Sequence, residues 1–84
     1  MKKQKKTKSV SPLKKEETLK KLGARIRQLR LEKGHDSYEH FAYDNDISRS
    51  QFGKYEHGAD VRFTTIIKIV NGLDISLEDF FKGM

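Results

Sequence analysis

The spacing of the apolar residues constrains the fold of this chain more than any other feature. Leu19, Leu22, Ile26 and Leu29 recur at helical intervals, and similar intervals return later in the chain. No stretch alternates between polar and apolar residues for long enough to form a sheet. At 84 residues, the chain is expected to form one small domain. The pattern therefore predicts an all-α fold of five short helices around a single apolar core.

Turn-forming and capping residues set the expected limits of the first helices. Gly34 follows the first core helix and is expected to end it as a C-terminal glycine. Ser37 is placed to cap a second helix over residues 38–44. Asn45 and Asp46 both tolerate a left-handed backbone, so they are expected to break the chain after that helix.

Two helices are expected to complete the core. Apolar residues at helical spacing predict a fourth, amphipathic helix, formed by Phe63, Ile66, Ile67, Val70 and Leu73. Because no alternating strand flanks Asn71-Gly72, we interpret this pair as the fraying end of that helix and not as a hairpin turn. Ser76, with Asp79 three residues later, begins a last helix that carries Leu77, Phe80 and Phe81.

Positive charge is concentrated at the N-terminus. Residues 1–15 contain seven lysines and no acid, whereas residues 16–84 carry 11 basic and 12 acidic side chains. We expect residues 1–17 to form a flexible Lys-rich tail and residues 18–84 to form the folded domain. Such a tail attracts polyanions, namely DNA, RNA or an acidic membrane, without choosing among them. A solvated tail that only aids solubility is the alternative.

Several classes of function are unfavoured by the composition. The chain has no Cys, which excludes a disulfide framework and a Cys-based zinc site and favours a reducing, cytoplasmic location. No apolar run approaches the roughly 20 residues that a membrane span needs. His35, His40 and His57 lack the spacing of metal ligands, and the serines before the helices are interpreted as caps. We therefore expect no enzyme activity, no metal or cofactor, and no small-molecule substrate.

The most informative segment is Tyr38–His57, in which the second helix is followed by a short turn and a third helix over residues 48–57. Ser48 and Gln51 form a capping box in which the side chain of each residue is expected to accept a hydrogen bond from the backbone N–H of the other. Because the turn is too short for antiparallel packing, the two helices should cross steeply. The residues of this segment that are expected to face the core are Phe41, Ala42, Ile47, Phe52 and Tyr55. The opposite face of the third helix then displays Arg49, Ser50, Gly53 and Lys54.

These residues resemble those of a known family. The stretches that carry the resemblance are LGARIRQLRLEKG (22–34), ISRSQFGKYEHG (47–58) and IIKIVNGLDISLEDFF (66–81). They are similar to the lambda-repressor/Cro-type helix-turn-helix family, also called the XRE family. The resemblance extends from about Leu22 to Phe81 and leaves the Lys tail outside. It implies a compact five-helix, lambda-repressor-like DNA-binding domain whose 48–57 helix enters the major groove of double-stranded DNA.

The resemblance also implies roles for individual residues. By position, the residues that read base edges are Arg49, Ser50 and Lys54, and an Arg side chain suits this role because it can bridge guanine with two hydrogen bonds. The positions that contact phosphates in the family match Tyr38, Gln51 and the segment ending at Arg62. We expect the tail to add a flexible arm that lies along the DNA backbone or in the minor groove, with its first lysines as phosphate contacts: Lys2, Lys3, Lys5 and Lys6.

Some positions depart from the family pattern. Asp46 stands where Gly is common and adds a negative charge to the turn, Asn45 stands where an apolar residue is common, and Tyr38 replaces an amide. Gly53 lowers helix propensity by about 1 kcal/mol, which suggests close approach either to DNA or to a neighbouring helix. Glu56 is expected to pair with a basic residue of the first helix. The basic residues of that helix are otherwise expected to form a solvated face, with Arg25, Arg27 and Arg30 as its members.

We predict a sequence-specific regulator of transcription, acting as a repressor. Exposed apolar side chains at the C-terminus, Phe81 and Met84, are expected to form a homodimer or partner surface. A two-fold dimer would bind a palindromic operator. The main alternative is a protein-interaction module, such as an antitoxin, that uses the same fold to hold a partner. RNA binding through the tail is a further alternative, but the chain lacks the aromatic platform typical of single-strand binders.

Overall fold

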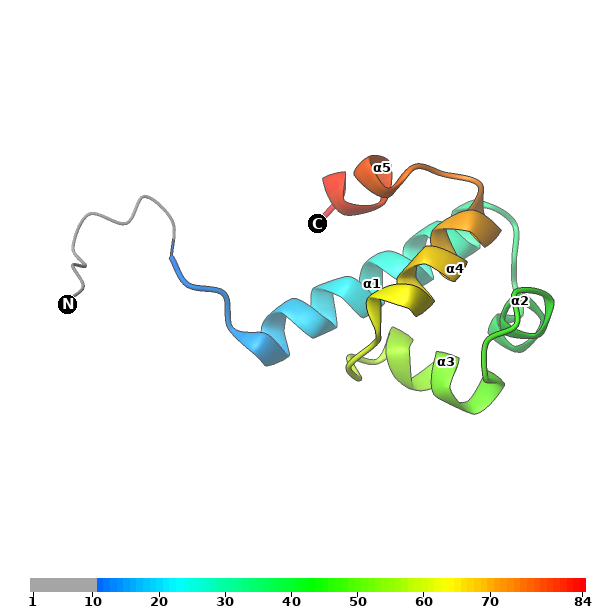
Figure 1. The fold of residues 1–84 in the computed structure, drawn as a ribbon, viewed down its shortest axis with the longest axis horizontal. Helices are drawn as coiled ribbons and strands as arrows, with labels where there is room; N and C mark the ends of the chain where they lie inside the picture. The colour runs from blue at the N-terminus through cyan, green and yellow to red at the C-terminus, as the bar shows by residue number, and fades with distance from the viewer. Residues whose placement is uncertain (1–10) are drawn as a thin grey trace.

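The computed structural model describes residues 11–84. The tail lysines proposed as phosphate contacts, at positions 2, 3, 5 and 6, lie outside the described residues, as does most of the segment predicted to be flexible. Between residues 11 and 84 the chain is all-helical, without a strand (Figure 1). The helices are α1 (Lys15–Glu32), α2 (Tyr38–Asp44), α3 (Arg49–Glu56), α4 (Phe63–Leu73) and α5 (Leu77–Lys82). The predicted all-α, five-helix architecture is confirmed.

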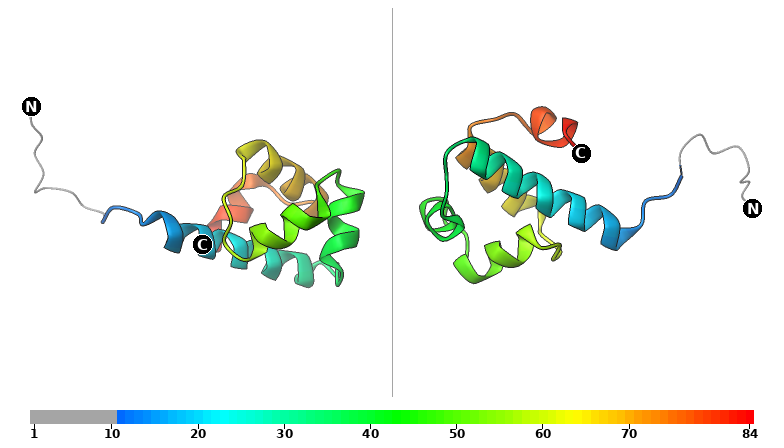
Figure 2. Two further views of the ribbon diagram at one scale, coloured as in Figure 1. Left: turned by 90° about the horizontal axis from the view of Figure 1, so that it is seen from below. Right: turned by 180° about the vertical axis from the view of Figure 1, so that it is seen from behind.

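The helices pack around α1, which is the longest. α3 packs against both α1 and α2, while α4 contacts α1 and α5. Seen from behind, α1 crosses in front of α4, with α3 on one side and α5 on the other (Figure 2). α5 therefore lies on the far side of the molecule from α3.

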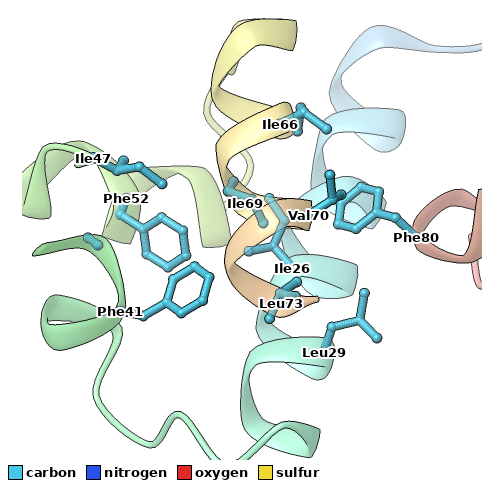
Figure 3. Packing of buried hydrophobic residues seen from close by; sticks show 11 residues of the cluster. Ile26, Leu29, Phe41, Ile47, Phe52, Ile66, Ile69, Val70, Leu73 and Phe80 are labelled. Carbon is cyan, nitrogen blue, oxygen red and sulfur yellow. The ribbon is translucent and has the colours of Figure 1, made fainter. Parts of the chain in front are cut away.

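The core lies where all five helices meet (Figure 3). Phe41 and Phe52, from α2 and α3, pack with ring centroids 5.4 Å apart, and Phe80 approaches from α5 on the opposite side. The side chains with 1% exposure or less are Ile26, Phe41, Ala42, Phe52, Ile69, Leu73 and Phe80. Burial of these apolar side chains is the main stabilising contribution to the fold.

The predicted helix caps are largely present. The Oγ atoms of Ser37 and Ser76 accept hydrogen bonds from the backbone N–H groups of His40 and Asp79, at 3.2 and 3.0 Å. Ser48 Oγ accepts from the Gln51 N–H at 3.3 Å. The reciprocal half of the predicted capping box, in which the Gln51 side chain would accept from the Ser48 N–H, is absent within residues 11–84. The Ser48 hydroxyl also lies 3.3 Å from the Ser50 hydroxyl.

The helix α1 begins earlier than the predicted domain boundary at residue 18. Lys15, Glu16 and Glu17 form its first turn, so the last three residues of the range predicted as tail are helical. The reason is electrostatic and local: the carboxylates of Glu16 and Glu17 lie at the positive end of the helix dipole. No side chain in the described part of the chain caps this end.

The buried face of α4 differs from the predicted one. Phe63 and Ile67 are 55% and 43% exposed, whereas Ile69, which the predicted stripe omitted, is fully buried. The buried set is Ile66, Ile69, Val70 and Leu73, which is again helical spacing but is rotated away from the expected stripe. The spacing alone allowed both stripes, and packing against α1 and α5 selects one.

The end of α4 also differs from the predicted one. Asn71-Gly72 does not fray: the helix continues to Leu73, and Asp74, in the left-handed region with φ 58°, ends it. A Cβ atom on Gly72 would lie 2.4–2.7 Å from the side chain of Asn45. Asn45 in turn donates from Nδ2 to the Phe41 carbonyl at 2.8 Å. Gly72 therefore provides the space in which Asn45 closes the end of α2.

The predicted ion pair of Glu56 is confirmed, with Arg30 as the partner. Arg30 Nε and Nη2 lie 2.6 and 3.0 Å from the Glu56 carboxylate, and both residues are buried. Arg30 Nη1 also donates to the carbonyls of His35 and Asp36, at 2.7 and 2.9 Å. The predicted solvated basic face is therefore wrong for Arg30, because this side chain joins α1, α3 and the connection between α1 and α2.

The predicted basic face is also wrong for Arg25. Arg25 donates from Nε to the Phe80 carbonyl and from Nη2 to the Asp79 carbonyl, both at 2.8 Å. These carbonyls belong to a helix of only six residues, in which the last carbonyl groups have no intrahelical donor. Arg25 supplies donors at that end of α5, while Arg27 remains exposed as predicted.

Candidate nucleic-acid interface

The turn between α2 and α3 has a defined geometry. Asp46 occupies the left-handed region with φ 59°, and the Ile47 N–H donates to the Ala42 carbonyl at 2.8 Å. Ile47 is buried and fixes the turn to the core. Lys68, from α4, donates from Nζ to the Asp46 carbonyl at 2.9 Å and lies 3.7 Å from its carboxylate. The family-atypical Asp46 therefore adopts the expected left-handed conformation, and Lys68 lies beside its negative charge.

The two faces of α3 differ as predicted. Phe52 is fully buried, and Tyr55 is half-buried against the core. Arg49, Ser50 and Lys54 are exposed, and we call these three residues the reading face. The side chains on the inner face fix the orientation of the helix, which leaves the reading face open to a ligand. The predicted exposure is confirmed, while base reading by these residues stays a prediction.

Gly53 is small because of a neighbouring helix. A Cβ atom at this position would lie 3.1–3.3 Å from the ring of Tyr38, which comes from the first turn of α2. The Tyr38 ring also stacks on Phe52, with centroids 6.4 Å apart, and remains 38% exposed. Close approach to a neighbouring helix is therefore supported as an explanation for Gly53, while close approach to DNA stays a prediction. The Tyr38 hydroxyl group lies on one flank of the reading face.

Gln51 and Arg62 lie together on another flank. They line a shallow polar hollow with Tyr55, Asp60 and Thr65, beside the start of α4. Arg62 is the N-cap residue of α4, and no side chain within residues 11–84 caps this helix. Uncapped N–H groups at a helix start suit an anion such as a phosphate. Asp60 places one negative charge in the same hollow.

Tyr43 is a surface residue that sequence reasoning missed. It lies next to the end of α2, and its side chain is 72% exposed. The Arg49 Cζ atom lies 5.9 Å from the centroid of its ring. The only signal in the sequence was an aromatic residue directly after the core residues Phe41 and Ala42, which places it on a different face of the same helix.

The predicted partner surface lies away from the reading face. Phe81 and Met84 are 41% and 39% exposed at α5, where Leu77 is also exposed, while Phe80 is buried as expected. α5 lies on the other side of α1 and α4 from α3 (Figure 1). The structure thus separates the candidate DNA surface from the candidate partner surface.

Other kinds of site find little support in the described residues. No group of three or more His, Asp or Glu side chains between residues 11 and 84 is arranged to hold a metal ion. In the same part of the chain, no helix is both long enough and apolar enough to span a membrane.

The comparisons with known proteins place the chain in a family. No family model matches it, and neither does any curated protein. Among solved structures, it is similar to the restriction-modification controller protein C.AhdI from Aeromonas hydrophila. The identity is 36%, the TM-score is 0.72, and the match covers 77% of this chain and 98% of that protein. Together with the helix-turn-helix geometry, this likeness shows that the chain belongs to the lambda-repressor/Cro-type (XRE) family of helix-turn-helix DNA-binding proteins.

Proposed function

We propose that this protein is a regulator of transcription that binds a specific double-stranded DNA sequence and acts as a repressor. The observation that carries the proposal is the reading face, which stands outward on a helix whose other face packs on the core through Phe52 and Tyr55. The similarity to a restriction-modification controller protein supports a regulatory role. It also makes restriction-modification genes the first candidates for regulation.

The reading face has the chemistry for direct readout in the major groove. α3 is an α-helix of eight residues, and an α-helix with its side chains is about 10–12 Å across, which fits a major groove about 12 Å wide. Arg49 is its first residue and can donate two hydrogen bonds to one guanine. Ser50 can donate or accept, and Lys54 stands one turn further along the same face.

Phosphate contacts would fix α3 in the groove. Tyr38 offers a hydroxyl donor on one flank, and Gln51 and Arg62 offer donors on another, beside the uncapped start of α4. Such contacts set the register but carry no sequence information. The tail lysines Lys2, Lys3, Lys5 and Lys6 would add attraction that does not depend on sequence, which suits a body with slightly more acidic than basic side chains.

Dimerisation through α5 would place two reading faces on one operator. Phe81 and Met84 expose apolar surface away from α3, so a second copy could pack there while α3 occupies the groove. A two-fold dimer predicts a palindromic site with half-sites about one DNA turn, ~34 Å, apart. A dimer covering a promoter would block polymerase sterically, which is why we favour repression.

Selection of bound duplexes from a random pool tests the proposal. We expect enrichment of one palindromic motif, and the absence of any enriched duplex would overturn it. Arg49→Ala should then weaken binding to the selected site by about 1–3 kcal/mol and relax one base position. Deletion of residues 1–10 should weaken all duplexes equally and flatten the salt dependence.

A protein-interaction module is the second candidate function. The exposed apolar side chains of α5 favour it, because they could hold a different protein as well as a second copy. Co-purification of a stoichiometric partner from the native host, together with no protected DNA in footprinting, would support this role over DNA binding.

A further inference from the structure

Tyr43 has no role in the core and no role in the contacts proposed so far. A side chain that is 72% exposed contributes little to burial, yet the ring is held next to Arg49, with 5.9 Å between the Arg49 Cζ and the ring centroid. We propose that Tyr43 is a positioning residue: its ring holds the Arg49 guanidinium in the orientation that reads a base, by a cation–π contact. The inference rests on the proposed function, because it assumes that Arg49 is a reader.

The backbone that carries both side chains is fixed. Asp46 N–H donates to the carbonyl of Tyr43 itself at 3.3 Å, and Ile47 N–H donates to the Ala42 carbonyl at 2.8 Å. Arg49 begins α3 directly after its cap, Ser48. The ring and the guanidinium therefore face each other across a turn that allows little movement of either attachment point.

A ring holds this guanidinium in a way that a carboxylate could not. Glu39 lines the same surface hollow as Arg49, yet Arg49 forms no ion pair with any carboxylate in the part of the chain that the structure describes. An acid would occupy the N–H donors that must reach guanine. A ring attracts the charge without accepting those donors, so the N–H groups remain available for the base.

This arrangement favours binding in two ways. A free Arg side chain loses rotamer freedom when it docks, and a side chain that is already held loses less. The cation–π contact also strengthens when DNA excludes water from the interface. We therefore expect Tyr43 to affect the discrimination that Arg49 provides, and not simply the overall affinity.

Two substitutions of Tyr43 separate the ring from its hydroxyl group. Because the side chain is mostly exposed, both variants should keep the melting temperature of the wild type. Tyr43→Leu should weaken binding to the selected duplex roughly two- to fivefold and lower the discrimination at the base pair that Arg49 reads. Tyr43→Phe keeps the ring and should stay close to wild type in both respects. Equal losses in Tyr43→Leu and Tyr43→Phe would overturn the inference and assign the effect to the hydroxyl group, as in a phosphate contact.

A double-mutant cycle tests whether Tyr43 acts through Arg49. In the Arg49→Ala background, Tyr43→Leu should cause no further loss. An equal loss in both backgrounds, on all duplexes, would overturn the inference but leave the proposed function intact. An Arg49→Ala variant that keeps full discrimination would overturn both.

The contact can also be tested without DNA, by nuclear magnetic resonance of the free protein. The side-chain protons of Arg49 should show upfield ring-current shifts in the wild type and in Tyr43→Phe, and these should disappear in Tyr43→Leu. Unshifted Arg49 protons in the wild type would overturn the inference whatever the DNA measurements give.

Discussion

The α2–α3 unit and α5 are held in place by different amounts of buried structure. The α2–α3 unit contributes Phe41, Ala42 and Phe52 to the core, and the Arg30–Glu56 pair ties it to α1. α5 contributes one buried side chain, Phe80, and otherwise depends on hydrogen bonds from Arg25. A reading surface must be in position before DNA arrives, so strong anchoring suits the first unit. Weaker anchoring is compatible with the proposal that a partner binds at α5.

The largest expected effect comes from breaking the ion pair that anchors α3. Glu56→Ala leaves the Arg30 guanidinium buried without a counter-charge, which should lower the free energy of unfolding by about 3–5 kcal/mol. Urea unfolding followed by circular dichroism measures this loss.

A double variant distinguishes the cost of leaving one buried charge unpaired from the cost of losing the whole ion pair. Arg30→Met with Glu56→Leu replaces both charges by apolar side chains and should recover part of the stability lost in Glu56→Ala. The recovery should be incomplete, because Arg30→Met also removes the hydrogen bonds to the His35 and Asp36 carbonyls. If the single variant loses less than about 1 kcal/mol, the ion pair does not anchor α3 and the contrast between the two regions fails.

A second prediction concerns the close approach of α1 and α3. A Cβ atom on Gly23 would lie 2.4 Å from the Tyr55 carbonyl oxygen and 2.8 Å from that of Glu56. Both are backbone atoms that cannot move aside without shifting α3, so Gly23→Ala should cost about 1–3 kcal/mol despite the better helix propensity of Ala.

The adjacent Ala24 offers a matched control for this prediction, because it is exposed in the same helix. Ala24→Gly should cost only about 1 kcal/mol, through helix propensity alone. Thermal unfolding of the two variants compares them directly. A Gly23→Ala variant at least as stable as the wild type would contradict the close packing.

The sequence was sufficient to predict those parts of the fold that depend on near neighbours. The caps at Ser37 and Ser76 and the left-handed turn at Asp46 involve residues within a few positions of one another. Apolar spacing identified the helices themselves. In α4 the spacing was compatible with two apolar stripes, and the packing of the other helices determines that Ile69 is buried and Ile67 is exposed.

Contacts between distant residues account for most of what could not be predicted. The sequence indicated that Glu56 pairs with a basic residue of the first helix, but it could not identify Arg30, 26 positions away, as the partner, and Arg30 was therefore assigned to a solvated face. The role of Gly23 depends on the carbonyl groups of α3. At the candidate site, the exposure of Arg49 followed from the helical pattern, but the ring of Tyr43 beside it did not. Neither helical spacing nor a capping motif in the sequence indicates that two side chains on opposite sides of a turn will be in contact.

A third prediction tests the weaker anchoring of α5. Arg25→Gln removes the two hydrogen bonds to the Asp79 and Phe80 carbonyls, which should lower the free energy of unfolding by about 1–2 kcal/mol. If α5 forms the dimer surface, the variant should also dimerise more weakly in sedimentation equilibrium. Arg27→Gln, in the same helix but exposed, is the matched control and should change neither quantity. Equal behaviour of the two variants would show that Phe80 alone holds α5.

The smallest expected effect on stability comes from substitutions of Asp46, in the turn before the reading face. They test whether the backbone conformation of this residue or its charge stabilises the turn. Lys68 donates its shorter contact, 2.9 Å, to the Asp46 carbonyl, while the carboxylate is 3.7 Å away and its side chain is 99% exposed. Asp46→Asn should therefore keep the wild-type stability, because Asn also tolerates the left-handed conformation. Asp46→Ala should lose about 1 kcal/mol, because Ala is strained there.

Asp74 provides the control for this last comparison, since it has φ 58° at the end of α4 and no ion pair with any residue from 11 to 84. Asp74→Ala should lose as much as Asp46→Ala in chemical denaturation if conformation alone decides both. An Asp46→Asn variant as unstable as Asp46→Ala would instead mean that the carboxylate and Lys68 hold the turn by charge. In that case the turn should weaken as salt is added, and the anchoring of the reading face would depend on ionic strength.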